Sequence, residues 1–263
     1  MSAARHPKRS PVPGSQVPQK TFAGQKHPGR LLPLSGHNAQ GRSWHNHWAG
    51  DHNPHLAAML ESIDDGVGLI AQKLKELGLE QDTILIFSSD NGGETKVTSN
   101  APLRGGKSQL YEGGIRVPLI VRWPGKISGG KTSSQPTVNV DFYPTLLEAA
   151  KVKPDKAQKL DGVSILANWT NPKSRPKRDA IYWHYPLEKP HFLGGISGGA
   201  IQTDNWKLIE SFDTGKVELY NLAKEVGEKN NLAEKRPKLA ERLQSQLIVW
   251  RKAVGATKEP PKR

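Results

Sequence analysis

Hydrophobic residues recur every three or four positions between residues 56 and 77, which is the spacing of one face of an α-helix. Asn53 precedes this segment as a helix-capping residue, and Pro54 occupies the first helical position. Gly78 follows as the end signal. The sequence therefore predicts an amphipathic helix whose apolar face packs on a sheet. That face consists of Leu56, Met59, Leu60, Ile63, Val67, Ile70, Leu74 and Leu77.

The next segments alternate between strand and helix patterns. Residues 83–87 form a short, continuous apolar run rich in β-branched residues, typical of a strand buried on both faces of a parallel sheet. Residues 117–123 predict a second buried strand, and residues 141–150 a helix with Leu146, Leu147 and Ala150 turned inward. Strands alternating with helices indicate a doubly wound α/β sheet.

The pattern changes near residue 175. Four short strands, at residues 180–184, 200–203, 206–209 and 217–220, are separated by turns and suggest a small antiparallel sheet. A final helix over residues 237–254 carries an apolar stripe that would pack on this sheet. That stripe consists of Leu239, Leu243, Leu247 and Trp250. We divide the chain into a tail at residues 1–51, an α/β core at 52–174 and an antiparallel subdomain at 175–263.

The tail differs from the rest of the chain in composition. Residues 1–50 contain seven Lys and Arg and no Asp or Glu, more than half of the net charge of +13. Without a sustained hydrophobic period, this segment is predicted to be disordered. A polyanion-binding arm, or a displaced start or reading frame, is the alternative. A nucleic-acid role is disfavoured because aromatic residues are sparse there and charge alone gives only non-specific, salt-sensitive binding.

Polar residues with metal-binding potential follow the strand predicted at residues 83–87. Ligands bind beyond the carboxyl ends of strands in open α/β sheets, and Asp90 and Asn91 stand at that position. A carboxylate beside an amide carbonyl supplies hard oxygen ligands, suited to calcium or magnesium. The long Gly-rich loop at residues 92–114 then presents Lys107, an ammonium suited to an anionic oxygen. Arg104 is a weaker candidate, because it could instead pair with an acid and hold the loop.

Several ordered motifs stand between about Asn53 and Val254. They are Ser-Asp-Asn-Gly-Gly (89–93), Ala-Pro-Leu-Arg-Gly-Gly-Lys (101–107), Glu-Gly-Gly-Ile-Arg-Val-Pro (112–118), Arg-Trp-Pro-Gly (122–125), Asp-Phe-Tyr-Pro-Thr (141–145) and Glu-Leu-Tyr-Asn-Leu (218–222). Together these motifs resemble the formylglycine-dependent sulfatases of the alkaline phosphatase superfamily. The resemblance implies an alkaline-phosphatase-like fold and hydrolysis of a sulfate ester of a small molecule or glycan. It implies that Asp90 and Asn91 bind calcium, that Lys107 contacts the sulfate and that His184 contacts substrate, with Arg104 as a further substrate-binding candidate.

The resemblance also implies a nucleophile that the sequence does not supply. Members of the family make formylglycine from Cys or Ser in a Cys/Ser-x-Pro-Ser/Ala-x-Arg motif, whereas this chain has no cysteine and no such motif. The nearest match, Ser-Ser-Gln-Pro-Thr-Val (133–138), lacks the arginine and lies downstream of Asp90. We therefore expect the chain alone to be inactive, with an N-terminal region or a partner chain needed to complete the site.

Two alternatives stay open at this point. One is a non-catalytic sulfatase remnant or sulfated-glycan-binding module, and the other is a phosphoester or phosphonate hydrolase of the same superfamily. The sequence contains no run of eighteen or more apolar residues, so no membrane span is predicted, and no signal peptide is visible. Sulfatases of this kind are often periplasmic or secreted, but the sequence leaves the location of this chain undecided.

Overall fold

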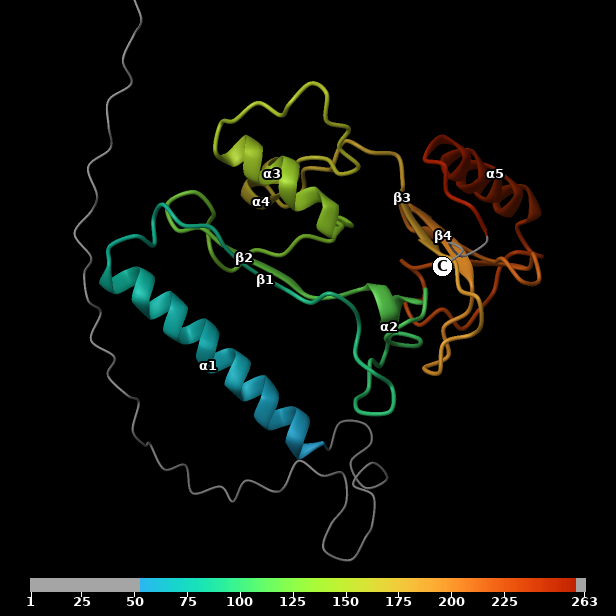
Figure 1. The fold of residues 1–263 in the computed structure, drawn as a ribbon, viewed down its shortest axis with the longest axis horizontal. Helices are drawn as coiled ribbons and strands as arrows, with labels where there is room; N and C mark the ends of the chain where they lie inside the picture. The colour runs from blue at the N-terminus through green and yellow to red at the C-terminus, as the bar shows by residue number, and fades with distance from the viewer. Residues whose placement is uncertain (1–52, 259–263) are drawn as a thin grey trace, which may run out of the picture.

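The computed structural model describes residues 53–258, so the tail predicted at residues 1–51 lies outside the described residues. One part of the fold contains helix α1 (Pro54–Glu76), a two-stranded ribbon and short helices, and the other contains a four-stranded sheet covered by helix α5 (Pro237–Ala253) (Figure 1). Within the described residues, no helix is long and apolar enough to cross a membrane.

Helix α1 spans Pro54–Glu76, as the hydrophobic spacing predicts. The side chain of Asn53 caps it by accepting hydrogen bonds from the backbone N–H groups of His55 and Leu56, both at 3.1 Å. Gly78 follows the helix with a left-handed φ of 67°. The expected packing on a sheet is wrong, because no residue of α1 is buried and Met59 is 63% exposed. The described residues next to α1 supply only a two-stranded ribbon, which offers too little surface to cover its apolar face.

That ribbon pairs β1 (Leu85–Ser88) with β2 (Leu119–Arg122) in antiparallel register, with Leu85 opposite Arg122. The strand predicted at residues 83–87 therefore exists, but the prediction of a parallel strand buried on both faces is wrong. Its residues are at most half-buried, since the described residues provide one antiparallel neighbour for β1. The α/β class itself is confirmed.

A buried aspartate organises the segment that follows the ribbon, which contains η3 (Asn139–Asp141), α3 (Phe142–Ala149) and α4 (Leu166–Thr170). The carboxylate of Asp141 is fully buried and accepts hydrogen bonds from the backbone N–H groups of Val138, at 2.9 Å, and Val163, at 3.1 Å. The guanidinium of Arg178 donates to it at 2.7 Å. Helix α3 matches the prediction, but Leu146 is 41% exposed and Ala150 also lies at the surface, so the expected inward face is wrong at both positions.

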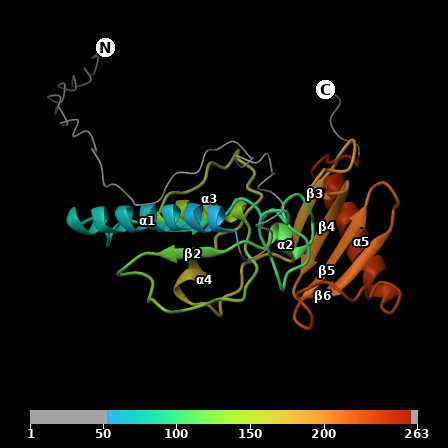
Figure 2. The same ribbon diagram turned by 90° about the horizontal axis from the view of Figure 1, so that it is seen from below.

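The C-terminal part confirms the predicted antiparallel sheet and terminal helix. Its strands are β3 (Ile181–Tyr185), β4 (Gly198–Thr203), β5 (Trp206–Ser211) and β6 (Val217–Asn221), hydrogen-bonded in that order. Helix α5 (Pro237–Ala253) covers one face of the sheet, and the short helix α2 (Glu112–Ile115) lies on the opposite side (Figure 2).

The strand alternation assigns successive side chains to these two faces. On the α5 side, Ile201, Leu208 and Leu219 pack with Leu243 and Leu247, and all five are fully buried. On the other side, a second cluster packs against the glycine-rich loop. Its members are Ala200, Ile209 and Tyr220, with Leu110 and Tyr111 of the loop.

Candidate functional site

Glycines fold the loop at residues 92–114 into a compact unit that ends in α2 (Glu112–Ile115). The backbone N–H of Gly92 donates to the carbonyl of Gly114 at 3.0 Å, and that of Lys107 donates to the carbonyl of Gly93 at 3.0 Å. A Cβ atom on Gly92 would lie 1.7 Å from the carbonyl oxygen of Gly113. Only glycine permits so close an approach of two backbone segments, so the start and the end of the loop lie directly against each other.

Asp90, Asn91 and Lys107 line the same open hollow, of about 2500 Å³, although they come from different segments. Asp90 and Asn91 follow β1 directly, and the Asn91 side-chain amide donates a hydrogen bond to the Asp90 carboxylate at 2.5 Å. The side chain of Lys107 is exposed at this surface. The arrangement therefore presents two oxygen-bearing groups and one ammonium to an anion or a cation entering the hollow.

Asp90 and Asn91 offer the oxygen ligands that calcium prefers, but two residues are too few to complete a calcium site. Calcium takes six to eight oxygen ligands in proteins, and the pair supplies a minor part of such a shell. Between residues 53 and 258 there is no group of three or more His, Cys, Asp or Glu side chains that could hold a metal ion. The two residues could hold calcium only together with oxygens from elsewhere.

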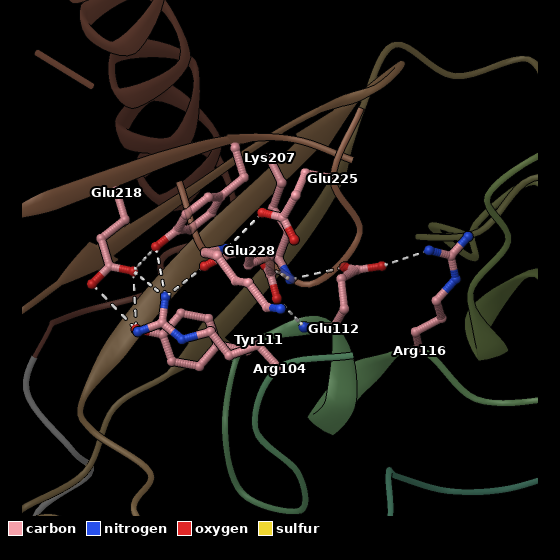
Figure 3. A network of polar contacts seen from close by, with 10 residues as sticks. Arg104, Tyr111, Glu112, Arg116, Lys207, Glu218, Glu225 and Glu228 are labelled. Atoms are coloured by element: carbon pink, nitrogen blue, oxygen red, sulfur yellow. Dashed lines mark hydrogen bonds and ion pairs between the residues drawn. The ribbon is translucent and has the colours of Figure 1, made fainter. Parts of the chain in front are cut away.

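Beside the hollow lies a buried network of ionic groups that sequence reasoning missed (Figure 3). The ammonium of Lys207, on β5, is fully buried and lies 2.9 Å from the carboxylates of both Glu112 and Glu228. Glu228 also accepts a hydrogen bond from the backbone N–H of Glu112 at 2.6 Å. Arg116 pairs with the outer oxygen of Glu112 at 3.2 Å. Burial raises the pKa of Glu228, and Lys207 opposes this effect.

The network joins residues too distant in sequence for a motif to reveal their contact. Glu112 and Arg116 lie in one motif, and their pairing could be expected at a spacing of four residues on a helix. Glu228 lies 116 residues further along the chain than Glu112. The one further sequence feature that could have indicated the network is Lys207 itself, because a lysine at an inward-facing position of a buried strand needs an acidic partner.

Arg104 belongs to the same region but does not line the hollow. Its guanidinium donates to the Tyr220 hydroxyl at 2.8 Å and to the Glu228 carbonyl at 2.9 Å, and it lies 3.8 Å from the centre of the Tyr111 ring. Burial, and then the nearby Glu218 carboxylate, raise the pKa of Tyr111 to about 12. Through these contacts Arg104 holds the loop against the sheet. The role of Arg104 in substrate binding stays a prediction.

His184 borders the hollow, yet its ring packs on the α5 side of β3. The ring centre lies 5.3 Å from that of Phe212 and 6.5 Å from that of Trp250. Burial lowers the pKa of His184, so the neutral form is favoured. His184 lines the same hollow as Lys107, which comes from the loop on the opposite side of the sheet. Its role in substrate binding also stays a prediction.

Comparison with protein families gives two overlapping matches. Residues 18–152 match the family described as Sulfatase, and residues 106–253 match the family described as N-sulphoglucosamine sulphohydrolase, C-terminal. The first match begins within the basic segment, upstream of the motifs that start near Asn53.

Among curated relatives, a Sulfatase of Formosa agariphila is 33% identical over 216 residues, covering 74% of this chain and 39% of that protein. The Steryl-sulfatase of Mus musculus is 34% identical over 135 residues, covering 48% of this chain and 22% of that protein.

The solved structures that resemble this chain include two that were determined with a carbohydrate bound. The structure of Ps i-CgsB in complex with k-i-k-neocarrahexaose matches with a TM-score of 0.66 and 30% identity, over 74% of this chain and 42% of that one. BT4656 in complex with its substrate D-glucosamine-2-N,6-O-disulfate matches with a TM-score of 0.62 and 29% identity, over 73% of this chain and 39% of that one. The chain thus spans about two-fifths of the length of these two proteins and of the Formosa relative.

Proposed function

Because this chain belongs to the sulfatase family, we propose that the protein hydrolyses sulfate esters and that its substrate is a sulfated carbohydrate. The observation that carries this proposal is that Asp90, Asn91 and Lys107, from two segments of the chain, line one hollow. The carbohydrate substrate is supported by the complexes of two structural relatives with k-i-k-neocarrahexaose and D-glucosamine-2-N,6-O-disulfate.

In this proposal each of the three residues has a separate task. Asp90 and Asn91 supply oxygens to a calcium ion, which when bound would polarise the sulfate group. Lys107 contacts a sulfate oxygen and stabilises the negative charge that develops as the ester bond breaks. The exposure of the Lys107 side chain supports this task, because an ammonium without a buried partner can reorient onto an entering anion.

We further propose that residues 1–263 alone do not turn over substrate. The chain has no cysteine and no formylglycine motif, and residues 53–258 contain no cluster of three or more His, Cys, Asp or Glu side chains that could hold a metal ion. When catalytic groups act as a unit, losing the nucleophile alone costs about as much activity as losing the whole unit. The same observation favours a second candidate, a module that binds sulfated glycans through Lys107 without hydrolysing them.

A chimaera separates hydrolysis from binding alone. The N-terminal part of the Formosa agariphila sulfatase would be joined to residues 53–263, and release of sulfate from an aryl sulfate and from sulfated oligosaccharides would be measured with calcium present. We expect turnover that Lys107→Ala abolishes and that Lys126→Ala, an exposed control outside the hollow, leaves unchanged. A folded chimaera that binds sulfated oligosaccharide without releasing sulfate would favour the binding module.

The unmodified chain provides the complementary assay. We expect its aryl sulfate hydrolysis to equal the blank. Turnover well above the blank that Lys107→Ala removes would refute the proposal that the chain alone is inactive.

A further inference from the structure

The turn at residues 225–229 lies against the glycine-rich loop, although more than a hundred residues separate them. Gly227 is buried there, and a Cβ atom on it would lie 2.9 Å from the carbonyl oxygen of Pro102. Glu228 follows with a φ of 51°, a left-handed conformation that is unfavourable for a residue with a side chain. The fold maintains this strained backbone where it meets the loop.

Glu228 holds the loop through both its backbone and its side chain (Figure 3). Its carbonyl accepts a hydrogen bond from Arg104 at 2.9 Å, and its carboxylate accepts one from the backbone N–H of Glu112 at 2.6 Å. The same carboxylate lies 2.9 Å from the Lys207 ammonium. One residue thereby connects the start of α2, the middle of the loop and the centre of the sheet.

The loop transmits this attachment to the hollow through backbone hydrogen bonds. Next to Glu112, the N–H of Gly113 donates to the Arg104 carbonyl at 2.7 Å, and the carbonyl of Gly114 accepts from Gly92 at 3.0 Å. The carbonyl of Gly93 accepts from the N–H of Lys107 at 3.0 Å. A shift of Glu112 would therefore move both the segment that follows Asp90 and the backbone of Lys107.

Stability alone does not account for the ionic groups. Removing charges from water costs free energy, and a buried ion pair is often no more stabilising than apolar side chains of the same volume. An ammonium with two carboxylates does impose fixed distances and directions, which apolar contacts do not. The three groups are therefore better suited to setting a position than to raising stability.

We propose that Glu228 is a positioning residue that fixes the place of Lys107 relative to Asp90 and Asn91 by holding Glu112 and Arg104. It acts through the loop and does not contact the substrate. This inference rests on the proposed function only in its assumption that Lys107 contacts sulfate. The attachment of the loop can be measured without any turnover.

The experiment uses amide hydrogen exchange on the 263-residue chain, with Glu228→Gln and Glu228→Leu compared. Both remove the charge, but only Gln retains an acceptor for the Glu112 N–H, and Lys207 keeps Glu112 as its partner in both. In Glu228→Leu we expect the Lys107, Glu112 and Gly113 amides to exchange about tenfold faster, with the β5 amides unchanged. Glu228→Gln should stay near the rates of the original chain. A general loss of stability would instead accelerate loop and sheet together.

A second pair of variants covers the case in which Glu228→Leu does not fold. Lys207→Met/Glu228→Leu removes one buried cation and one buried anion, and Arg251→Met/Glu210→Leu does the same on the α5 face of the sheet. Only the first pair should accelerate exchange in the loop. Equal loop exchange in both pairs, or loop rates that match the original chain throughout, would overturn the proposal. A chimaera without turnover would leave this result unaffected.

Discussion

Replacing the same residue type on two helices tests where the core of this chain lies. Leu243 of α5 is fully buried among Ile201, Leu208 and Leu219, whereas Leu60 of α1 is 56% exposed. Leu243→Ala removes about three carbon groups at about 0.8 kcal/mol each, which gives a transfer cost of roughly 2.4 kcal/mol. The cavity that remains adds to this cost, so we expect a loss of about 3–4 kcal/mol.

The loss should appear as a fall of roughly 6–16 °C in the thermal midpoint, given the usual relation for chains of this length. Tryptophan fluorescence is a suitable probe because Trp206 and Trp250 pack at the same core. Leu60→Ala should change the free energy of unfolding by less than about 0.5 kcal/mol, since the side chain is largely in water and alanine is an equally good helix former.

Two results would contradict this reasoning. A cost below about 1 kcal/mol for Leu243→Ala would mean that α5 does not pack as described. A cost for Leu60→Ala similar to that for Leu243→Ala would mean that the apolar face of α1 is covered in solution, by a second copy or by another segment.

The remaining predictions concern pH, calcium and a buried ion pair. Burial lowers the pKa of His184, so as pH falls the unfolded chain binds the proton before the folded chain does. The free energy of unfolding should therefore decrease as pH falls below about 6.5, the ordinary pKa of histidine. In urea titrations, His184→Gln should show a weaker dependence of this free energy on pH. Calorimetry should give a calcium dissociation constant of about 10⁻³ M or weaker, and micromolar binding abolished by Asp90→Ala would reveal further ligands. Asp141→Ala leaves Arg178 without its buried partner and should destabilise the chain by about 3–5 kcal/mol in chemical denaturation; a loss below about 1 kcal/mol would contradict the anchoring role.

Local pattern was sufficient for most of the secondary structure. Asn53, Pro54 and Gly78 delimit α1 through chemistry within a few residues of each helix end, and short turns separate β4 from β5 and β5 from β6. The sequence did not reveal that β1 pairs with an antiparallel strand or that α1 has an exposed apolar face. An apolar stripe shows that a helix prefers burial, but what covers it depends on segments elsewhere in the fold.

The candidate site divides in the same way. Asp90, Asn91 and Lys107 stand within motifs, so their sharing of one hollow could be expected from the resemblance. The role of Glu228 could not, because its contact with Glu112 depends on how the sheet places β5 beside the loop. A residue that holds a loop distant in sequence, as Glu228 does, shows no pattern in its own local sequence that would reveal the contact.

Strand β5 shows how one alternating pattern secures both covering elements of the sheet. Lys207 points toward the loop and meets Glu112 and Glu228, whereas Glu210, three positions later, points toward α5 and meets Arg251. Slipping β5 by one residue would move each charged group to the opposite face and bury it among apolar side chains, at a cost of several kcal/mol per charge. The two buried charged residues of β5, with their partners, therefore favour one register of this strand. Because the register of β5 also determines where Lys207 meets the loop, the placement of α5 and that of Lys107 depend on the same strand.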